Sequence, residues 1–382
     1  MVQNIAWAAV QDGATHPDLT TLAHLGTSGR HPNNMYKELT NKLMPSPVTC
    51  ATSTITIWCK RLGKTPISVE QVILLPHNLF SCLYHCHRDV FNKQILGGGD
   101  HEVQRFWQAA EGNPYYDQHP VSARGNHRSR CVPLFLHGDG VSTSGCGRAW
   151  AKGVDAFSWG SMLAQTSNVI TSMFLIFMLF GKLMVETGNM NTFKAFERKL
   201  AHSFYWLFLG KHPKRDEHDR EYPRHSAEYK KATENNGWLA DGYFAVLWKI
   251  RGDLEHMSSR WRFVSTSCTT APCSCCRADD QDGGRPWTDG RLDLAKWIET
   301  IWDNASWAAA HPDRSHIFKV LPGLGIMSWM PDMMHCLHLG CYQYAFASLL
   351  KLLTHYTLPG SHDDNCEMVW REVKQYYKDI LS

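Results

Sequence analysis

Residues 131–140 read CVPLFLHGDG, an apolar run that ends in a Gly-Asp-Gly sequence. The run is short and apolar and is closed by turn-forming residues, so it predicts a buried β-strand that leads into a tight turn. Asp139 then follows directly on the strand. In α/β folds ligands bind at the carboxyl ends of strands, so this position is the first candidate for a functional residue.

The segments downstream extend the predicted core in the order strand, strand, helix, strand. Apolar residues in the predicted helix recur at helical spacing, and the strand segments are short and rich in β-branched or aromatic residues. Asp253 follows the last strand as Asp139 follows the first. We therefore expect an α/β fold with a mixed sheet and two acids at its strand ends. The four segments are residues 154–163, 169–180, 192–209 and 242–250.

The region before residue 131 has a different pattern. Between residues 68 and 107 apolar residues recur at helical spacing, and residues 112–130 are polar and basic. We expect a helical N-terminal region with a connector over residues 1–130. The sheet domain then covers residues 131–382, with a cysteine-containing insertion at about 254–331. The densely charged residues 210–236 predict a solvated loop or helix.

The composition is that of a globular protein, because 43% of the 382 residues are hydrophobic and only 20% are charged. A net charge of +3 permits a nucleic-acid partner without arguing for one. The N-terminal residues lack the features of a signal peptide, so the 13 cysteines predict thiols or metal ligands in a reducing compartment. The longest apolar run, residues 169–180, is shorter than the ~20 residues of a membrane span, so no membrane is expected.

Asp139 and Asp253 are candidates for metal binding. Two carboxylates at adjacent strand ends can hold divalent cations through oxygen ligands, and such ions support phosphoryl transfer. The alternative is ordinary turn chemistry, since aspartate beside glycine is common in turns.

The cysteines at 272–276 (PCSCC) suggest a second kind of site. Cys273 and Cys276 form a C-x-x-C pair, which supplies two of the four thiolate or imidazole ligands of a structural zinc ion. A redox-active or purely structural pair is the alternative. The residues that could complete a zinc site are His256, His311, His316, His335 and Cys336.

Residues 329–340 (WMPDMMHCLHLG) combine Asp332 and His335 at a spacing of one helical turn. An acid at this spacing can orient an imidazole, which would indicate a functional element. Asp332 is equally suited to be the N-cap of a buried helix, because a carboxylate there accepts a backbone N–H bond and suits the helix dipole. Both interpretations stay open on spacing alone.

Together the sequences PLFLHGDG, KIRGD, PCSCC and DMMHCLHLG, in this order, resemble a cut-and-paste DDE transposase of the CACTA (En/Spm-like, Transposase 21) group. The resemblance implies an RNase H-like fold over roughly residues 70–355. It makes Asp139 the first catalytic acid and Asp253 the second, although Asp241 and Glu255 lie close enough to be confused with the latter.

The same resemblance assigns the remaining motifs. Cys273 and Cys276 match the cysteine pair of the group, with zinc as the ion that would brace the insertion. Asp332 and His335 match its D-x-x-H motif, in which the histidine supports the catalytic site and the aspartate positions it.

The implied activity is Mg²⁺- or Mn²⁺-dependent cleavage and strand transfer of DNA in the nucleus, with transposon ends as the partner and a homo-oligomer left open. The family's last glutamate should follow the D-x-x-H motif, yet only Glu367 and Glu372 remain there, so a fragment or degenerate copy is expected. The alternatives are a non-catalytic DNA- or protein-binding domain and a zinc-stabilised interaction module.

Overall fold

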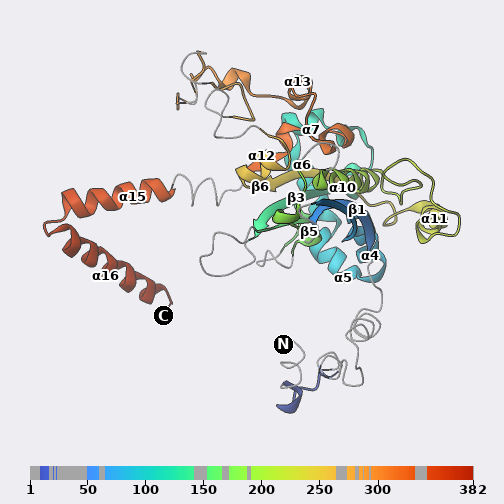
Figure 1. Ribbon diagram of the computed structural model, residues 1–382, viewed down its shortest axis with the longest axis horizontal. Helices are drawn as coiled ribbons and strands as arrows, with labels where there is room; N and C mark the ends of the chain where they lie inside the picture. Colours follow the sequence, from blue (N-terminus) through green and yellow to red (C-terminus); the bar gives the residue numbers. More distant parts are fainter. Residues whose placement is uncertain are drawn as a thin grey trace. The chain divides into compact units, whose positions relative to one another are not determined.

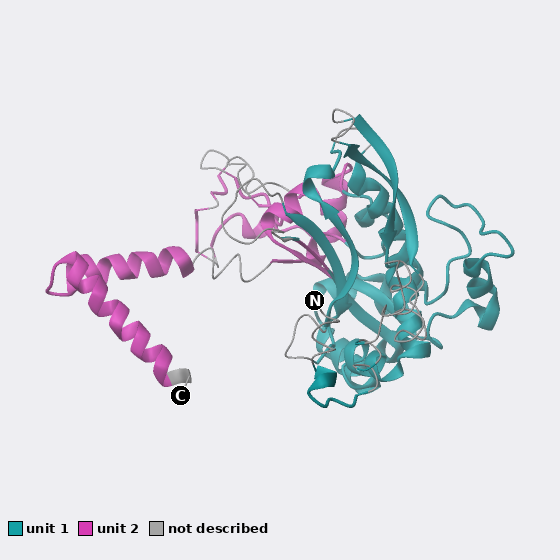
Figure 2. Cartoon of the chain, turned by 60° about the horizontal axis from the view of Figure 1, so that its bottom comes forward, with its two compact units in different colours: residues 1–136, 140–248, 315–324 teal, residues 137–139, 249–314, 325–382 magenta. Residues whose placement is uncertain are grey.

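The computed structural model describes residues 9–16, 20, 23, 50–59, 65–141, 153–165, 172–186, 191–263, 273–279, 284–286, 288–291, 294–331 and 342–381 (Figure 1). The chain divides into two compact units, which are coloured separately in Figure 2. Unit 1 contains residues 1–136, 140–248 and 315–324, and unit 2 contains residues 137–139, 249–314 and 325–382. This division does not coincide with the boundary that the sequence predicts at residue 130.

The central element is a five-stranded sheet with the order β5-β4-β3-β6-β7. Strands β4 and β5 pair in antiparallel fashion, whereas β6 and β7 are parallel, so the sheet is mixed and the predicted mixed α/β architecture is confirmed. Strand β3, which comes first in the chain among these five strands, lies at the centre of the sheet. The strands are β3 (Cys131–Val141), β4 (Val154–Ser161), β5 (Phe174–Phe180), β6 (Phe244–Gly252) and β7 (Trp329–Pro331).

Strands β3 and β6 run in the same direction. Near their beginnings the backbone N–H of Val246 bonds the thiol of Cys131. Near their ends a methyl group placed on Gly252 would lie 3.0 Å from the carbonyl oxygen of Gly138. The residue numbers of the partners increase together along the two strands, so the strands are parallel and the carboxyl ends of β3 and β6 meet at one edge of the sheet.

Helix α10 (Thr192–Leu209) carries the connection from β5 to β6 and forms much of the core of unit 1. Its predicted apolar stripe is buried, and the ring of Phe196 stacks on that of Phe177 from β5 at 4.0 Å between centroids. The side chain of Asn191 caps its first turn by accepting a bond from the N–H of Lys194, and Gly210 ends it at a φ of 73°.

The N-terminal part of unit 1 corrects the expectation of a helical region. Two strands, β1 (Ala51–Cys59) and β2 (Thr65–Ile73), pair in antiparallel fashion and form a hairpin, so residues 68–73 are strand rather than helix. Helices follow it up to β3, namely α4 (Pro76–Cys86), α5 (Arg88–Val90), α6 (Asp100–Ala110), α7 (Pro114–Gln118) and α8 (His127–Arg130), with a π-helical turn at Phe91–Ile95 and a 3-10 turn at Pro120–Ala123.

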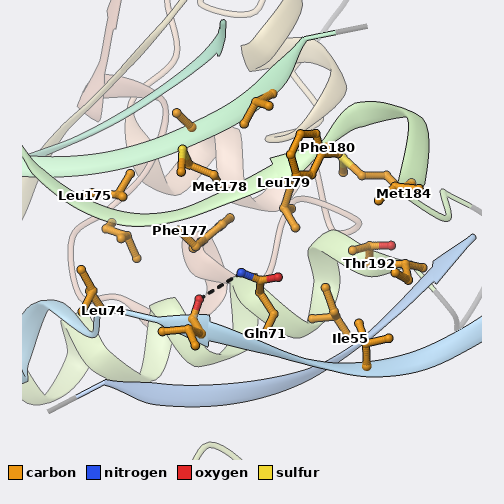
Figure 3. A pocket seen from close by; sticks show the side chains of 17 residues that line it. Ile55, Gln71, Leu74, Leu175, Phe177, Met178, Leu179, Phe180, Met184 and Thr192 are labelled. Atoms are coloured by element: carbon orange, nitrogen blue, oxygen red, sulfur yellow. Dashed lines mark hydrogen bonds between the residues drawn. The ribbon is translucent and has the colours of Figure 1, made fainter. Parts of the chain in front are cut away.

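A cavity of about 650 Å³ lies within unit 1 between this hairpin and strands β4 and β5 (Figure 3). Its labelled lining residues are almost all apolar, and Gln71 and Thr192 are the polar exceptions among them. Because no acid, histidine or cysteine lines it, this cavity is not where the predicted chemistry would take place.

Within unit 1, the charged segment that follows α10 carries only α11 (Ala227–Thr233) and a 3-10 turn at Glu234–Gly237, in keeping with the predicted solvated loop. The other unit 1 helix is α14 (Ile317–Val320). The N–H of Ile317 donates to Glu197 of α10 at 2.9 Å, and this glutamate is only 4% exposed.

Unit 2 contains the ends of β3 and β6, strand β7, and helices α12 (Leu254–Ser259), α13 (Asn304–Ala310), α15 (Gln343–Leu352) and α16 (His362–Leu381). Asn365 fixes the turn between α15 and α16. Its amide donates to the carbonyl oxygens of Thr354, Leu358 and Gly360, and its own oxygen accepts from the N–H of Gly360. None of the helices that the structure describes combines the length and apolarity needed to cross a bilayer.

Candidate metal centre at the strand ends

The two predicted acids follow directly on two glycines that lie against each other. Gly138 and Gly252 are in contact at the ends of β3 and β6, and Asp139 and Asp253 are the next residues along each strand. Both aspartates are half-buried. Asp139 and Asp253 therefore both belong to the ends of neighbouring strands, within unit 2, and their role as metal ligands stays a prediction.

Asp253 also has a structural role. It is the N-cap of α12, and its Oδ1 accepts a hydrogen bond from the N–H of His256 at 2.5 Å. The turn-chemistry interpretation therefore accounts for one carboxylate oxygen. Its Oδ2 has no hydrogen-bond partner among the described residues, so this oxygen can serve as a ligand.

His256 is a part of the site that the sequence argument considered only as a zinc ligand. Its ring is 5% exposed and lies against Gly138, where no side chain competes for the space. Burial lowers the pKa of this imidazole to about 3, and the nearby Arg260 and His137 act in the same direction. The ring is therefore neutral at physiological pH and adds no positive charge that would repel a cation.

The donor set suits a hard, partly hydrated cation. Mg²⁺ commonly binds through one or two carboxylates and keeps several water ligands, so Asp139 and Asp253 are residues of the type that could hold it. No group of three or more His, Cys, Asp or Glu side chains in the described part of the chain is arranged to hold a metal ion.

The D-x-x-H element falls outside the described residues, because Asp332 and His335 both lie in the segment 332–341. The structure does describe the residue before it, Pro331, which pairs with Gly252 in the parallel ladder of β6 and β7. The candidate glutamates lie on α16, where Glu367 forms an exposed ion pair with Arg371 at 3.5 Å and Glu372 is exposed. Neither forms a metal-binding group with described acids.

The cysteine cluster is compact. The N–H of Cys275 donates to the sulfur of Cys273 at 3.3 Å, and hydrogen bonding from the Cys275 thiol lowers the pKa of Cys273 to about 5. Burial raises the pKa of Cys276 to about 11. His256 packs at the strand ends and His311 against Trp307, so neither of these two histidines joins the cysteines in a described metal-binding group. His335 and Cys336 lie outside the described residues, and zinc binding stays a prediction.

No protein-family model matches this sequence, and no curated protein or solved structure is significantly similar to it. The class that the fold itself defines is a mixed α/β protein with a five-stranded sheet. The assignment of an RNase H-like core and of a transposase stays a prediction from the motifs.

Proposed function

We propose that this protein is a transposase-like protein with an RNase H-like core that cleaves and joins DNA phosphodiester bonds with divalent metal ions held by Asp139 and Asp253. One observation carries the proposal. The two half-buried aspartates follow touching glycines at the ends of adjacent parallel strands. DNA as the partner, a nuclear location and any homo-oligomer belong to the same proposal.

The sheet order supports it. The fourth strand, β6, returns after α10 to pair beside the first strand, β3, rather than beside the third. Two acids that are distant in sequence meet only if their strands are neighbours. In the sequence an aspartate also follows the paired end of β7, since Asp332 is next to Pro331. Two neighbouring strands are therefore each followed by a predicted catalytic acid, and the third is followed in the sequence by Asp332, the residue proposed to orient His335.

In the proposed reaction the carboxylates of Asp139 and Asp253 would hold the cation. When bound, the metal would stabilise the negative charge on the phosphate oxygens and lower the pKa of an attacking water or 3′-hydroxyl. The buried, neutral His256 packs against the two glycines that precede the acids. His335, oriented by Asp332, is proposed to support the site.

Metal binding tests the proposal directly, because its readout needs no third acid. Wild-type protein and variants are titrated with Mn²⁺, and free Mn²⁺ is followed by electron paramagnetic resonance. Asp139→Asn and Asp253→Asn should each weaken binding at least about tenfold, since each removes a charged ligand. Asparagine caps a helix as well as aspartate does, so Asp253→Asn removes the charge and keeps the start of α12.

Glu255→Gln is the matched control, because this exposed acid lies two residues from Asp253 and should leave Mn²⁺ binding unchanged. Nicking of supercoiled plasmid with Mn²⁺ is the second assay, and Asp139→Asn should abolish it. Absence of Mn²⁺ binding by the wild-type protein would overturn the metal site. Metal binding and DNA binding without any nicking would instead favour the non-catalytic DNA-binding alternative.

A further inference from the structure

A second cavity, of about 360 Å³, lies within unit 2 and takes no part in the acid pair. Its inner wall is made of the buried side chains of Phe263, Ser274 and Trp307. The other lining residues are Arg262, Ala310, His311, Pro312, Asp313 and Arg314. The volume is near the lower end of the ~300–1,000 Å³ that small-molecule sites occupy, so one compact ligand would fill it.

One wall of the cavity is aromatic. The rings of Trp307 and His311 are stacked with centroids 5.4 Å apart and an angle of 29° between their planes. Phe263 meets Trp307 edge-on at 5.8 Å, and a contact between His311 Nδ1 and the carbonyl of Trp307 holds the imidazole in place. A fixed aromatic surface of this kind favours a flat ring as ligand.

Two arginines border the same cavity, and neither forms an ion pair with a described acid. Arg262 Nη1 donates to the carbonyl oxygen of Asp313 at 3.3 Å. Arg314 Nη1 donates to the carbonyl oxygens of Ala308 at 2.8 Å and His311 at 3.2 Å. These bonds to backbone oxygens orient both guanidinium groups, and no acid among the described residues neutralises their charges. The carboxylate of Asp313 is the single acid that lines the cavity, so arginine charge exceeds acidic charge there.

The end of α12 places Arg262 beside the cavity. Arg262 has a φ of 61°, and the N–H of the next residue, Phe263, donates to the carbonyl oxygen of Met257 at 3.1 Å, so this left-handed conformation belongs to the C-terminal end of the helix. Arginine is also the residue best suited to bind phosphate through two parallel bonds.

We propose that this cavity binds a nucleoside phosphate, with the base against Trp307 and His311 and the phosphate on Arg262 and Arg314. The same chemistry is offered by a free mononucleotide and by an unpaired nucleotide of a DNA strand. The inference goes beyond the metal centre and does not depend on it, because no residue is shared between the two sites.

Binding is measured on the full chain by calorimetry, with dAMP, deoxyadenosine, inorganic phosphate and a ten-nucleotide single strand as separate probes. We expect dAMP or the single strand to bind more tightly than deoxyadenosine or phosphate. Arg262→Gln should weaken that binding about tenfold or more, because it removes the charge of an exposed hydrogen-bond donor that lines the cavity. His311→Ala should weaken binding of the nucleotide but leave binding of inorganic phosphate as it is.

Arg291→Gln is the control for charge, because this exposed arginine pairs with Asp289 outside the cavity, and it should leave binding unchanged. Binding of dAMP identifies a free nucleotide as ligand, and binding of the single strand alone identifies a nucleotide within DNA. The proposal is overturned if neither probe binds, or if Arg291→Gln weakens binding as much as Arg262→Gln. Asp139→Asn should retain nucleotide binding, which separates this test from that of the metal centre.

Discussion

Gly138 has room for no side chain, and replacing it by alanine is the sharpest test of how the strand ends are packed. A methyl group at this position would lie 2.5 Å from Cε1 of the His256 ring and nearer still to Nε2. Carbon atoms in contact are normally about 3.5–4.0 Å apart, so the ring would have to move by about 1 Å or more. His256 is buried, and its Asp253 contact fixes the start of α12.

Overpacking of this kind costs about 1–3 kcal/mol in the free energy of unfolding. We therefore expect Gly138→Ala to destabilise the protein by that amount, as measured by urea unfolding followed by circular dichroism. The same displacement shifts Asp139 and Asp253 relative to each other, so Mn²⁺ affinity should fall together with stability. Gly140→Ala is the matched control on the same strand, because its nearest neighbour would be Oδ1 of Asp155 at 3.8 Å.

A double-mutant cycle isolates the clash. His256→Ala removes the ring that the new methyl group meets, so the double variant should be more stable than the sum of the two single effects by about 1–2 kcal/mol. If the two effects add within about 0.5 kcal/mol, or if Gly140→Ala costs as much as Gly138→Ala, the packing of His256 on Gly138 is not what limits this position.

Three further perturbations have expected outcomes. Burial lowers the pKa of His212 and of His119 to about 4, below the unfolded value near 6.5, so the unfolded chain binds the extra protons. The free energy of unfolding should therefore be highest above about pH 6.5 and should fall as the pH is lowered towards 4, by up to about 1.4 kcal/mol per pH unit for each histidine. Urea unfolding across this range measures the change, and a free energy of unfolding that does not vary with pH would contradict it. Asn365→Ala removes four hydrogen bonds from the turn between α15 and α16 and should destabilise it by on the order of 2 kcal/mol, seen as faster amide exchange over residues 354–360 with no change in unit 1. If zinc braces the insertion, the protein should carry one zinc per chain by elemental analysis, Cys273→Ser should lose it and the exposed Cys366→Ser should keep it; equal zinc in both variants would exclude Cys273 as a ligand.

The central strands were predictable because each is a short apolar run that is buried whatever its partner. The predicted segments at 131–137, 154–163 and 242–250 correspond to β3, β4 and β6, apart from two residues after β4 and two before β6, and the apolar stripe of 192–209 falls on α10. The hairpin β1–β2 was not predicted. Its strand at 65–73 is only partly buried, and its apolar residues are spaced in a way that also fits a helix. What decides between the two is pairing with residues 51–59, which a local pattern does not contain.

The same distinction applies to the candidate sites. The position of each aspartate after its strand is a local property, and the sequence predicts it for Asp139 and Asp253. That His256 fills the space beside Gly138 depends on two strands meeting, and no spacing in the sequence reports it. The cavity bordered by Arg262 and Arg314 was likewise missed, because it joins residues about fifty positions apart through backbone carbonyls.

Unit 1 is built from segments that are separated in the sequence by parts of unit 2, so it cannot be produced as one continuous fragment. Unit 1 is completed only by residues 315–324, which follow the long excursion through residues 249–314. A fragment that stops at residue 248 would lack the N–H of Ile317 and so remove a donor from the buried Glu197, at a cost of about 1–3 kcal/mol. Recombination at that point would therefore yield a poorly folded half.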